Sequence, residues 1–215
     1  MAVAIIVLGI FIFVGETLTR LSIRIEANVN NIFSKTLGLN YQPRGDVPSQ
    51  GKVFSKGYPG IVSNVFSGVI SENTFRFFDY FYRTRSGRMR TETILMVGEV
   101  NISNEFPRVI GIPRIWEEIF FSVYRWRPKD FKELSVEGEL GKNFILYIPS
   151  DIVVNDIAYQ KLLKLLNLIQ TIGNSGFECI DSKAYLFTGG KMGKNPSKIS
   201  SVYNNVLTFG EILNS

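Results

Sequence analysis

The sequence predicts an α+β fold, in which an N-terminal transmembrane helix and stalk precede a mainly antiparallel sheet with two to three packed helices. Residues 1–15 form an uninterrupted run of apolar or small residues. β-rich segments follow residue 60 and are separated by short turn sequences, as in hairpins. Residues 151–172 carry apolar residues at helical spacing, and hairpin strands with interspersed helices indicate α+β and not a doubly wound parallel sheet.

The apolar run predicts a membrane-spanning helix over residues 1–19. At 1.5 Å per residue the run extends about 22 Å, which is shorter than the ~30 Å hydrocarbon core of a bilayer. The span therefore requires Glu16 near the interface and Arg20 extending toward the headgroups. Two alternatives remain, a buried helix of a soluble protein and a cleaved signal peptide. The signal peptide fits less well because no basic region precedes the run.

Basic residues lie on one side of this run only. No Lys or Arg precedes it, whereas Arg20, Arg24 and Lys35 follow it. The positive-inside rule then predicts a single-pass protein of the cell membrane with a cytoplasmic C-terminal domain. The candidate membrane-interface residues are Arg20, Arg24 and Trp126. An arginine lies on each side of Trp126 in the sequence. The alternative places the tryptophan in the core and its neighbouring arginines in solvent.

Apolar residues continue beyond the span at three- and four-residue steps, which predicts an amphipathic stalk helix over residues 20–39 that Gly38 ends. These apolar residues are Leu18, Leu21, Ile25, Val29, Ile32 and Phe33. Residues 40–60 are rich in Gly, Pro, Ser and Gln and predict a linker. The soluble α+β domain then comprises residues 61–215.

The elements of this domain follow from β-rich composition, apolar residues at helical spacing, turn residues and caps. Ser86-Gly87 predicts a two-residue hairpin turn, Ser150 or Asp151 can cap one helix, and Asn195 can cap another with Pro196 at its first position. The predicted strands are residues 61–70, 74–85, 88–100, 108–112, 131–136, 143–148 and 177–188, the last with a bend near residue 181, and the predicted helices are residues 115–124, 151–172 and 196–213.

Composition removes the commonest catalytic chemistry. The chain contains no histidine, which excludes Ser-His-Asp and Cys-His nucleophiles and every His-ligated metal site. Its single cysteine, Cys179, cannot form an intramolecular disulfide. Residues 188–195 lie between a predicted strand and a predicted helix, as a phosphate-binding loop does. The glycine spacing is wrong, however, and Asn195 stands where Ser or Thr should hold magnesium. We therefore predict a basic surface loop, a non-enzymatic protein, and no metal or cofactor.

Four arginines at a hairpin tip form the candidate site for an anionic ligand. With Ser86-Gly87 as the turn, Arg85 should face Arg88 and Arg83 should face Arg90 on one face of the ribbon. Like charges directly opposite each other are destabilising, so an anionic lipid or a nucleic acid could bind there, with nucleic acid the less favoured. The net charge of +5 permits such a ligand without requiring it. The competing interpretation is a solvated tip that Glu92 and Asp79 partly neutralise.

Three groups of motifs resemble a known type of protein. They are Gly68 followed by Phe78-Asp79-Tyr80 and the basic hairpin, Phe106-Pro107-Arg108-Val109-Ile110 with a tryptophan-bearing helix, and Ser135-Val136-Glu137-Gly138 with Phe144-Ile145-Leu146-Tyr147, a Leu162-Leu163 helix and a strand over 177–187. Across residues 50–190 this layout resembles bacterial membrane-anchored domains of unknown function of the DUF3137 type. The resemblance implies membrane anchoring and an α+β architecture, and no catalytic residues.

The function that these observations predict is a non-enzymatic, membrane-anchored scaffolding module. Its partners would be the lipid bilayer, through the N-terminal helix, and an unidentified protein. A recognition module for anionic lipid or nucleic acid is the first alternative, and an enzyme based on carboxylates and lysines is the second.

Overall fold

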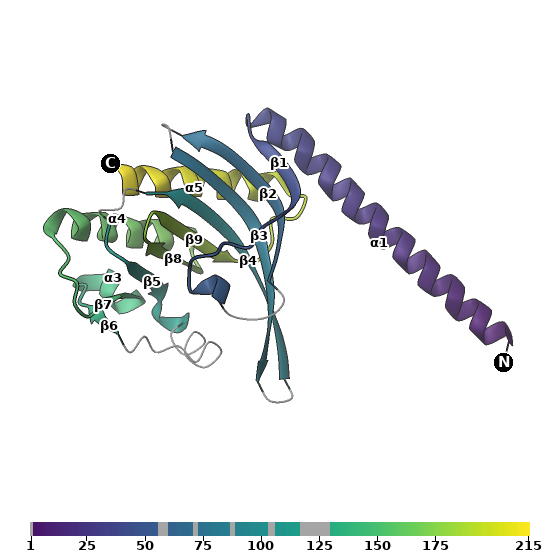
Figure 1. The fold of residues 1–215 in the computed structure, drawn as a ribbon, viewed down its shortest axis with the longest axis horizontal. Helices are drawn as coiled ribbons and strands as arrows, with labels where there is room; N and C mark the ends of the chain where they lie inside the picture. Colours follow the sequence, from purple (N-terminus) through teal and green to yellow (C-terminus); the bar gives the residue numbers. More distant parts are fainter. Residues whose placement is uncertain (1, 56–59, 71–72, 87–88, 103–105, 117–129) are drawn as a thin grey trace.

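The computed structural model describes residues 2–55, 60–70, 73–86, 89–102, 106–116 and 130–215, and for residues 2–16, 70, 85, 86 and 89 it describes the backbone alone (Figure 1). Helix α1 (Ala2–Thr36) is continuous across the predicted span and stalk. It ends as predicted at Gly38, whose φ is +68°. The Leu39 N–H donates to the Ser34 carbonyl at 2.8 Å, which closes the last turn.

The strands in the described residues form one antiparallel sheet in the order β1-β2-β3-β4-β9-β8-β5-β7-β6. The predicted α+β class with a mainly antiparallel sheet is therefore confirmed. The strands are β1 (Asn40–Gly45), β2 (Ile61–Ile70), β3 (Asn73–Ser86), β4 (Met89–Asn101), β5 (Val109–Pro113), β6 (Phe131–Leu134), β7 (Phe144–Pro149), β8 (Ser175–Ile180) and β9 (Lys183–Gly189).

Two helices cover one face of the sheet (Figure 1). Helix α4 (Asp156–Ile172) contributes Leu162, Leu165, Leu166 and Ile169 to the core, and α5 (Pro196–Asn214) contributes Ile199, Val206 and Phe209. Asn195 caps α5 with Pro196 in the first turn, as predicted. Asn155 caps α4, so this helix begins later than the predicted residue 151.

The other face of the sheet is rich in aromatic side chains. Phe78, Tyr80, Tyr82, Tyr185 and Phe187 are all buried there. The short helix η1 (Val53–Ser55) places the Phe54 ring 5.1 Å from Tyr80 and 4.9 Å from Tyr185. After β5, helix η2 (Arg114–Trp116) stacks Trp116 on Phe187 at 6.2 Å.

The predicted linker is wrong at residues 40–45, because these residues form the edge strand β1. Tyr41 pairs with Phe66, and their rings lie 5.1 Å apart. Pro43 cannot donate a backbone hydrogen bond, and an edge strand tolerates this because one of its sides has no neighbouring strand. Pairing with β2 thus outweighs the turn-like composition of the segment.

Two further predictions differ in detail. The predicted bent strand 177–188 is a hairpin of β8 and β9, in which Asp181 adopts a φ of 52°. Between the predicted strands 131–136 and 143–148 lies the short helix α3 (Gly138–Asn143), which connects β6 and β7. The predicted helix at residues 115–124 lies outside the described residues from residue 117 on.

Among the described residues, no helix contains a stretch that is both long and apolar enough to cross a membrane. The side chains of residues 1–15 lie outside that description, and the predicted span stays a prediction.

Candidate functional site at the junction of helix α1 and the sheet

Three buried polar side chains from three elements meet where the C-terminal part of α1 packs on the sheet. They are Asn30 of α1, Asn64 of β2 and Asp79 of β3, with exposed fractions of 0%, 5% and 2%. Polar side chains of this kind are rarely so buried without hydrogen-bond partners. We refer to these three residues, with Glu26 and loop residues 190–193, as the α1 junction.

Asn64 lies at the centre of the α1 junction. It sits where the β2 register shifts between Ser63 and Phe66, and its φ of 52° is one that asparagine tolerates better than most residues. Its amide nitrogen donates to Glu26 Oε1 at 2.7 Å and to Asp79 Oδ2 at 2.9 Å. Its amide oxygen accepts from Asn30 Nδ2 at 3.1 Å and from Tyr41 Oη at 3.0 Å. Both donors and both acceptor positions of this amide are therefore used.

Asp79 links the sheet to the loop between β9 and α5. Its carboxylate accepts from the Met192 N–H at 2.8 Å and from the Gly193 N–H at 3.4 Å. Burial raises the pKa of Asp79, and the hydrogen bonds from Asn64, Met192 and Gly193 offset this only in part. The carboxylate therefore fixes the loop and contributes no free reactive oxygen.

Helix α1 reaches the same loop through two contacts. Asn30 Nδ2 donates to the Gly193 carbonyl at 3.1 Å, and Lys191 Nζ lies 3.0 Å from Glu26 Oε1. Burial raises the pKa of Glu26, but the Asn64 hydrogen bond and the Lys191 charge outweigh it, so the net pKa is lowered. Since Met192 is only 1% exposed, the predicted basic surface loop is in part a buried connection.

The contacts of the α1 junction are of a structural kind and not of a catalytic kind. Its carboxylates are engaged by amide and backbone donors and by one lysine, and it contains no cysteine or hydroxyl nucleophile beside a base. No group of three or more His, Cys, Asp or Glu side chains in the described part of the chain could hold a metal ion. The α1 junction connects α1 to Asn64 of β2 and to the loop after β9.

The arginine hairpin has a different register from the predicted one. Arg83 faces Glu92, and Arg85 faces Arg90. The predicted pairs of Arg85 with Arg88 and of Arg83 with Arg90 are therefore wrong. The two registers differ by two residues in the partner strand and keep the same side chains on the same face, so the alternation of the sequence could not distinguish them.

Charge at this tip is partly neutralised. Arg83 Nε donates to Glu92 Oε1 at 2.8 Å, and its guanidinium lies 5.4 Å from the centre of the Phe81 ring. Asp79 takes no part in this neutralisation, because it is buried in the α1 junction. Arg90 is exposed, and Arg88 and the Arg85 side chain lie outside the described residues.

Of the predicted interface residues, the structure describes two. Arg20 and Arg24 are exposed on α1, and Trp126 lies outside the described residues. Cys179 is buried in β8, and burial raises the pKa of its thiol well above the usual value, as expected for an inert cysteine.

Glu178 of β8 is a second buried carboxylate, 1% exposed on the aromatic face of the sheet. It accepts from the Lys52 N–H at 2.6 Å, beside η1. Burial raises the pKa of Glu178 to about 7, against the opposing effects of the Lys52 N–H and the Arg108 charge. A charge inside the core is destabilising. The hydrogen bond between this carboxylate and the Lys52 N–H nevertheless holds the segment before η1 against the sheet.

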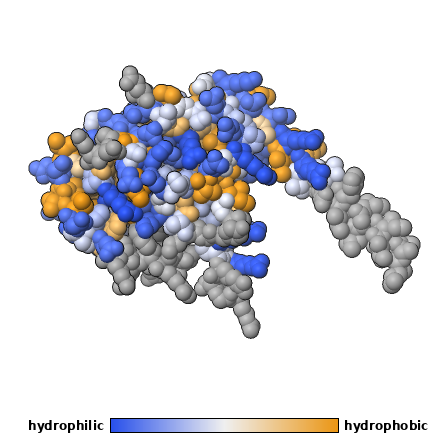
Figure 2. Space-filling model, viewed as in Figure 1, coloured by the Kyte–Doolittle hydropathy of each residue, from blue (hydrophilic) through white to orange (hydrophobic). Residues whose placement is uncertain are grey.

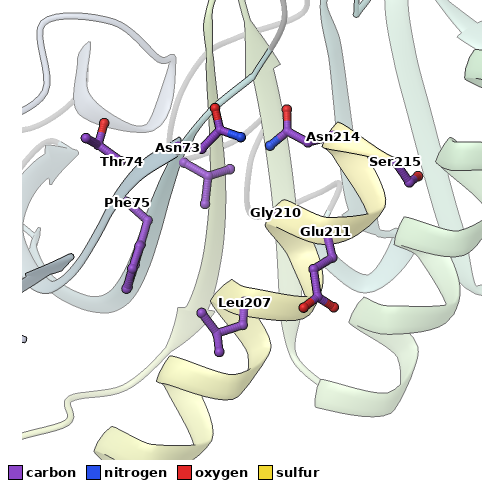
Figure 3. A pocket seen from close by; sticks show the side chains of 9 residues that line it. Asn73, Thr74, Phe75, Leu207, Gly210, Glu211, Asn214 and Ser215 are labelled. Carbon is purple, nitrogen blue, oxygen red and sulfur yellow. The ribbon is translucent and has the colours of Figure 1, made fainter. Parts of the chain in front are cut away.

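Hollows also occur on the described surface. One of about 220 Å³ lies between the start of β3 and the end of α5, with Phe75 and Leu207 in its apolar wall and Glu211 at its rim (Figure 3). Its lining includes one carboxylate and no cation, which offers no acid–base pair. On the molecular face in Figure 2, hydrophobic residues form several separate patches among hydrophilic ones.

Sequence reasoning missed the α1 junction, although one signal for it was present. Asp79 interrupts the aromatic run Phe77-Phe78-Asp79-Tyr80-Phe81. A single carboxylate at an apolar position indicates a buried polar contact, but the partners at residues 30, 64 and 192 are far away in the sequence.

No protein-family model matches the chain, and no curated protein matches it. Among solved structures, the chain is similar in fold to the mycobacterial trehalose monomycolate transport factor A, TtfA. The TM-score is 0.57 and the sequence identity 12%, over 87% of this chain and 94% of that chain. At this identity the likeness concerns the fold.

Proposed function

We propose that this chain is a non-enzymatic, membrane-anchored module, in which α1 holds the sheet domain at a fixed position beside the cytoplasmic face of the bilayer, where it binds a protein partner. The observation that carries the proposal is the α1 junction. It joins a continuous helix of 35 residues to the sheet through buried hydrogen bonds from Asn30 and Asn64.

The geometry of α1 suits a rigid spacer better than a flexible tether. At 1.5 Å per residue the helix is about 52 Å long. Its C-terminal part is docked on the domain from Glu26 to Ser34, while residues 17–25 are exposed and the N-terminal end lies far from the sheet (Figure 1). A flexible linker would let the domain rotate freely, whereas a docked helix transmits the orientation of its N-terminal part to the domain.

Three further observations support the proposal. The apolar run at residues 1–15 precedes basic residues, as in a cytoplasmic orientation. The buried carboxylates of Asp79 and Glu178 each accept a backbone N–H, as in structural contacts. The structure with a similar fold is named a transport factor, which is compatible with a role in handling or positioning and not in catalysis.

Membrane fractionation tests the anchor. The full chain should sediment with membranes through washes with high salt and alkaline carbonate, and detergent should release it. Replacing Ile6 and Phe11 with Arg should move the chain to the soluble fraction, because each arginine costs about 2.5–3.5 kcal/mol at the centre of a membrane helix.

The matched control adds the same two charges outside the apolar run. Ser22→Arg with Asn31→Arg alters exposed positions of α1 and should leave the chain in the membrane fraction. Protease added to right-side-out vesicles should spare the domain if it is cytoplasmic. Recovery of the unaltered full chain in the soluble fraction would contradict the anchor.

The arginine hairpin favours a second candidate function, recognition of an anionic lipid surface. Arg85 and Arg90 are direct cross-strand neighbours, and an anion between them would relieve the repulsion of like charges. Binding to vesicles with anionic lipid should weaken with added salt and on changing all four arginines (Arg83, Arg85, Arg88 and Arg90) to Ser. Unchanged binding in that variant would remove this candidate, and the fractionation result does not depend on it.

A further inference from the structure

Four large apolar side chains lie exposed on one face of α1. The exposed fractions of these side chains are 60% for Leu18, 52% for Leu21, 44% for Ile25 and 68% for Ile32. We call this set the α1 stripe. Exposed apolar residues that occur singly need no explanation, but a row of them along one helix face indicates a missing contact.

The α1 stripe lies opposite the face that docks on the domain. Asn30 and Ser34 define the docked face, with exposed fractions of 0% and 1%. Ile32 is two residues from each of them, which is about 200° around an α-helix. Leu18 and Ile25 precede Ile32 by whole heptads, which keeps them near the same direction. The described part of the domain therefore leaves the α1 stripe uncovered.

Its spacing is that of a coiled-coil seam. Leu18, Ile25 and Ile32 recur every seven residues, and Leu21 follows Leu18 by three. In heptad terms, these are the first and fourth positions. A β-branched residue at the first position with leucine at the fourth favours a parallel two-stranded assembly, and Ile25, Ile32 and Leu21 meet this preference.

Asn28 occupies the next fourth position, between Ile25 and Ile32, and is exposed. One asparagine in a coiled-coil seam fixes the register and the number of strands at some cost in stability. Its presence also argues against a bilayer surface as the occupant, because burying an amide among acyl chains without a partner is costly. The seam ends after Ile32, since the following fourth position is Lys35.

We propose that the α1 stripe is the seam of a parallel, two-stranded coiled coil between two copies of this chain. The charges beside the seam fit the parallel arrangement. One edge carries Arg24, and the other carries Ser22 and Val29. Parallel strands bring one edge against the other, whereas antiparallel strands bring like edges together and set Arg24 near its own copy.

The proposal rests on the proposed function in one respect, which is that the N-terminal helices confine both copies to the same membrane. The α1 stripe exposes on the order of 300 Å² of apolar surface per chain. Two copies then bury roughly 600 Å², which is below the ~1,200 Å² of stable interfaces. Two anchors in one membrane raise the effective concentration and hold the helices parallel, so a seam of this size suffices there. The docked face of each helix, with Asn30 and Ser34, then lies on the outer side of the helix pair.

Cysteine crosslinking of the full chain in native membranes tests the proposal. The native thiol, Cys179, is 0% exposed, so single cysteines can be placed at Ile25 or Ile32, the stripe positions well beyond the predicted span, without removing it. Under mild oxidation these variants should give disulfide-linked dimers several-fold faster than Ile23→Cys. Ile23 is the matched control, because it is 59% exposed on the same helix but lies off the stripe.

A second variant tests the seam without a disulfide. Ile25→Arg with Ile32→Arg should abolish energy transfer between two labelled copies in membranes, while Ile23→Arg should leave it unchanged. Equal crosslinking at positions 23 and 25 would overturn the proposal. The proposal would also fail if the stripe cysteines formed no crosslinks and lipid protected them from an aqueous maleimide, because the stripe would then contact the bilayer surface. Crosslinking confined to the α1 stripe in a chain that fractionates as soluble would support the seam and reject the anchor. Membrane recovery without that pattern would do the reverse.

Discussion

Replacing Asp79 with Ala should destabilise the domain by about 2 kcal/mol, which is a large effect for a single side chain without a large volume change. The carboxylate is 2% exposed and accepts the Met192 N–H at 2.8 Å and one Asn64 N–H at 2.9 Å. Asn64 keeps its contact with Glu26 at 2.7 Å after the substitution, but the Met192 N–H has no other acceptor that the described contacts supply.

The size of the effect comes from two opposing contributions. A buried N–H left without a partner costs about 1–3 kcal/mol, and each lost hydrogen bond to a charged group adds to this. Removing a carboxylate whose pKa is raised by burial relieves part of the cost of keeping it charged. Asp79→Asn should cost less than Asp79→Ala, because an amide oxygen can still accept from Met192.

Urea denaturation of the full chain in detergent micelles measures both variants. Asp181→Asn is the control, since Asp181 is exposed in the β8–β9 turn and asparagine also tolerates its φ of 52°. We expect a change within about 0.5 kcal/mol for this control. Amide exchange at Met192 should accelerate in Asp79→Ala. A destabilisation no larger than the control, with exchange unchanged, would refute the role assigned to the α1 junction.

Three other predictions concern stability. The pKa of Glu178 rises from 4.5 to about 7 on folding. The free energy of unfolding is therefore highest below pH ~4.5 and falls by about 3 kcal/mol as the pH rises through 7. Glu178→Gln should flatten this pH dependence in denaturation series, and an unchanged slope would contradict the assignment. Gly98→Ala would set a Cβ against Val206 Cγ2 and should lower the free energy of unfolding, measured by urea denaturation, by about 1–3 kcal/mol. Adding Val206→Ala should recover part of that loss, and full additivity would exclude the clash. Asn195→Ala removes the α5 cap and should cost about 1 kcal/mol by the same measurement, whereas no loss would mean that the cap is redundant.

Local signals were sufficient for several parts of the fold. β-rich composition located β2 at Ile61–Ile70, and Asn195 with Pro196 located the start of α5. These features depend on neighbouring residues alone. The β1 strand was missed because its composition is that of a loop, and only the pairing of Tyr41 with Phe66 across the sheet makes it extended. The hairpin register was missed because two registers leave the same faces buried.

The sequence by itself determined the elements whose causes are local, namely the continuous helix through Thr36, its end at Gly38 and the apolar spacing of the α1 stripe. Only the tertiary structure decided what that helix is attached to. Asp79 meets Met192 across 113 residues, and Asn30 meets Gly193 across 163. No periodicity encodes contacts at such separations, because they follow from how the sheet brings β2, β3 and the loop after β9 to one place. The same docking turns the α1 stripe away from the domain and leaves it available to a second copy.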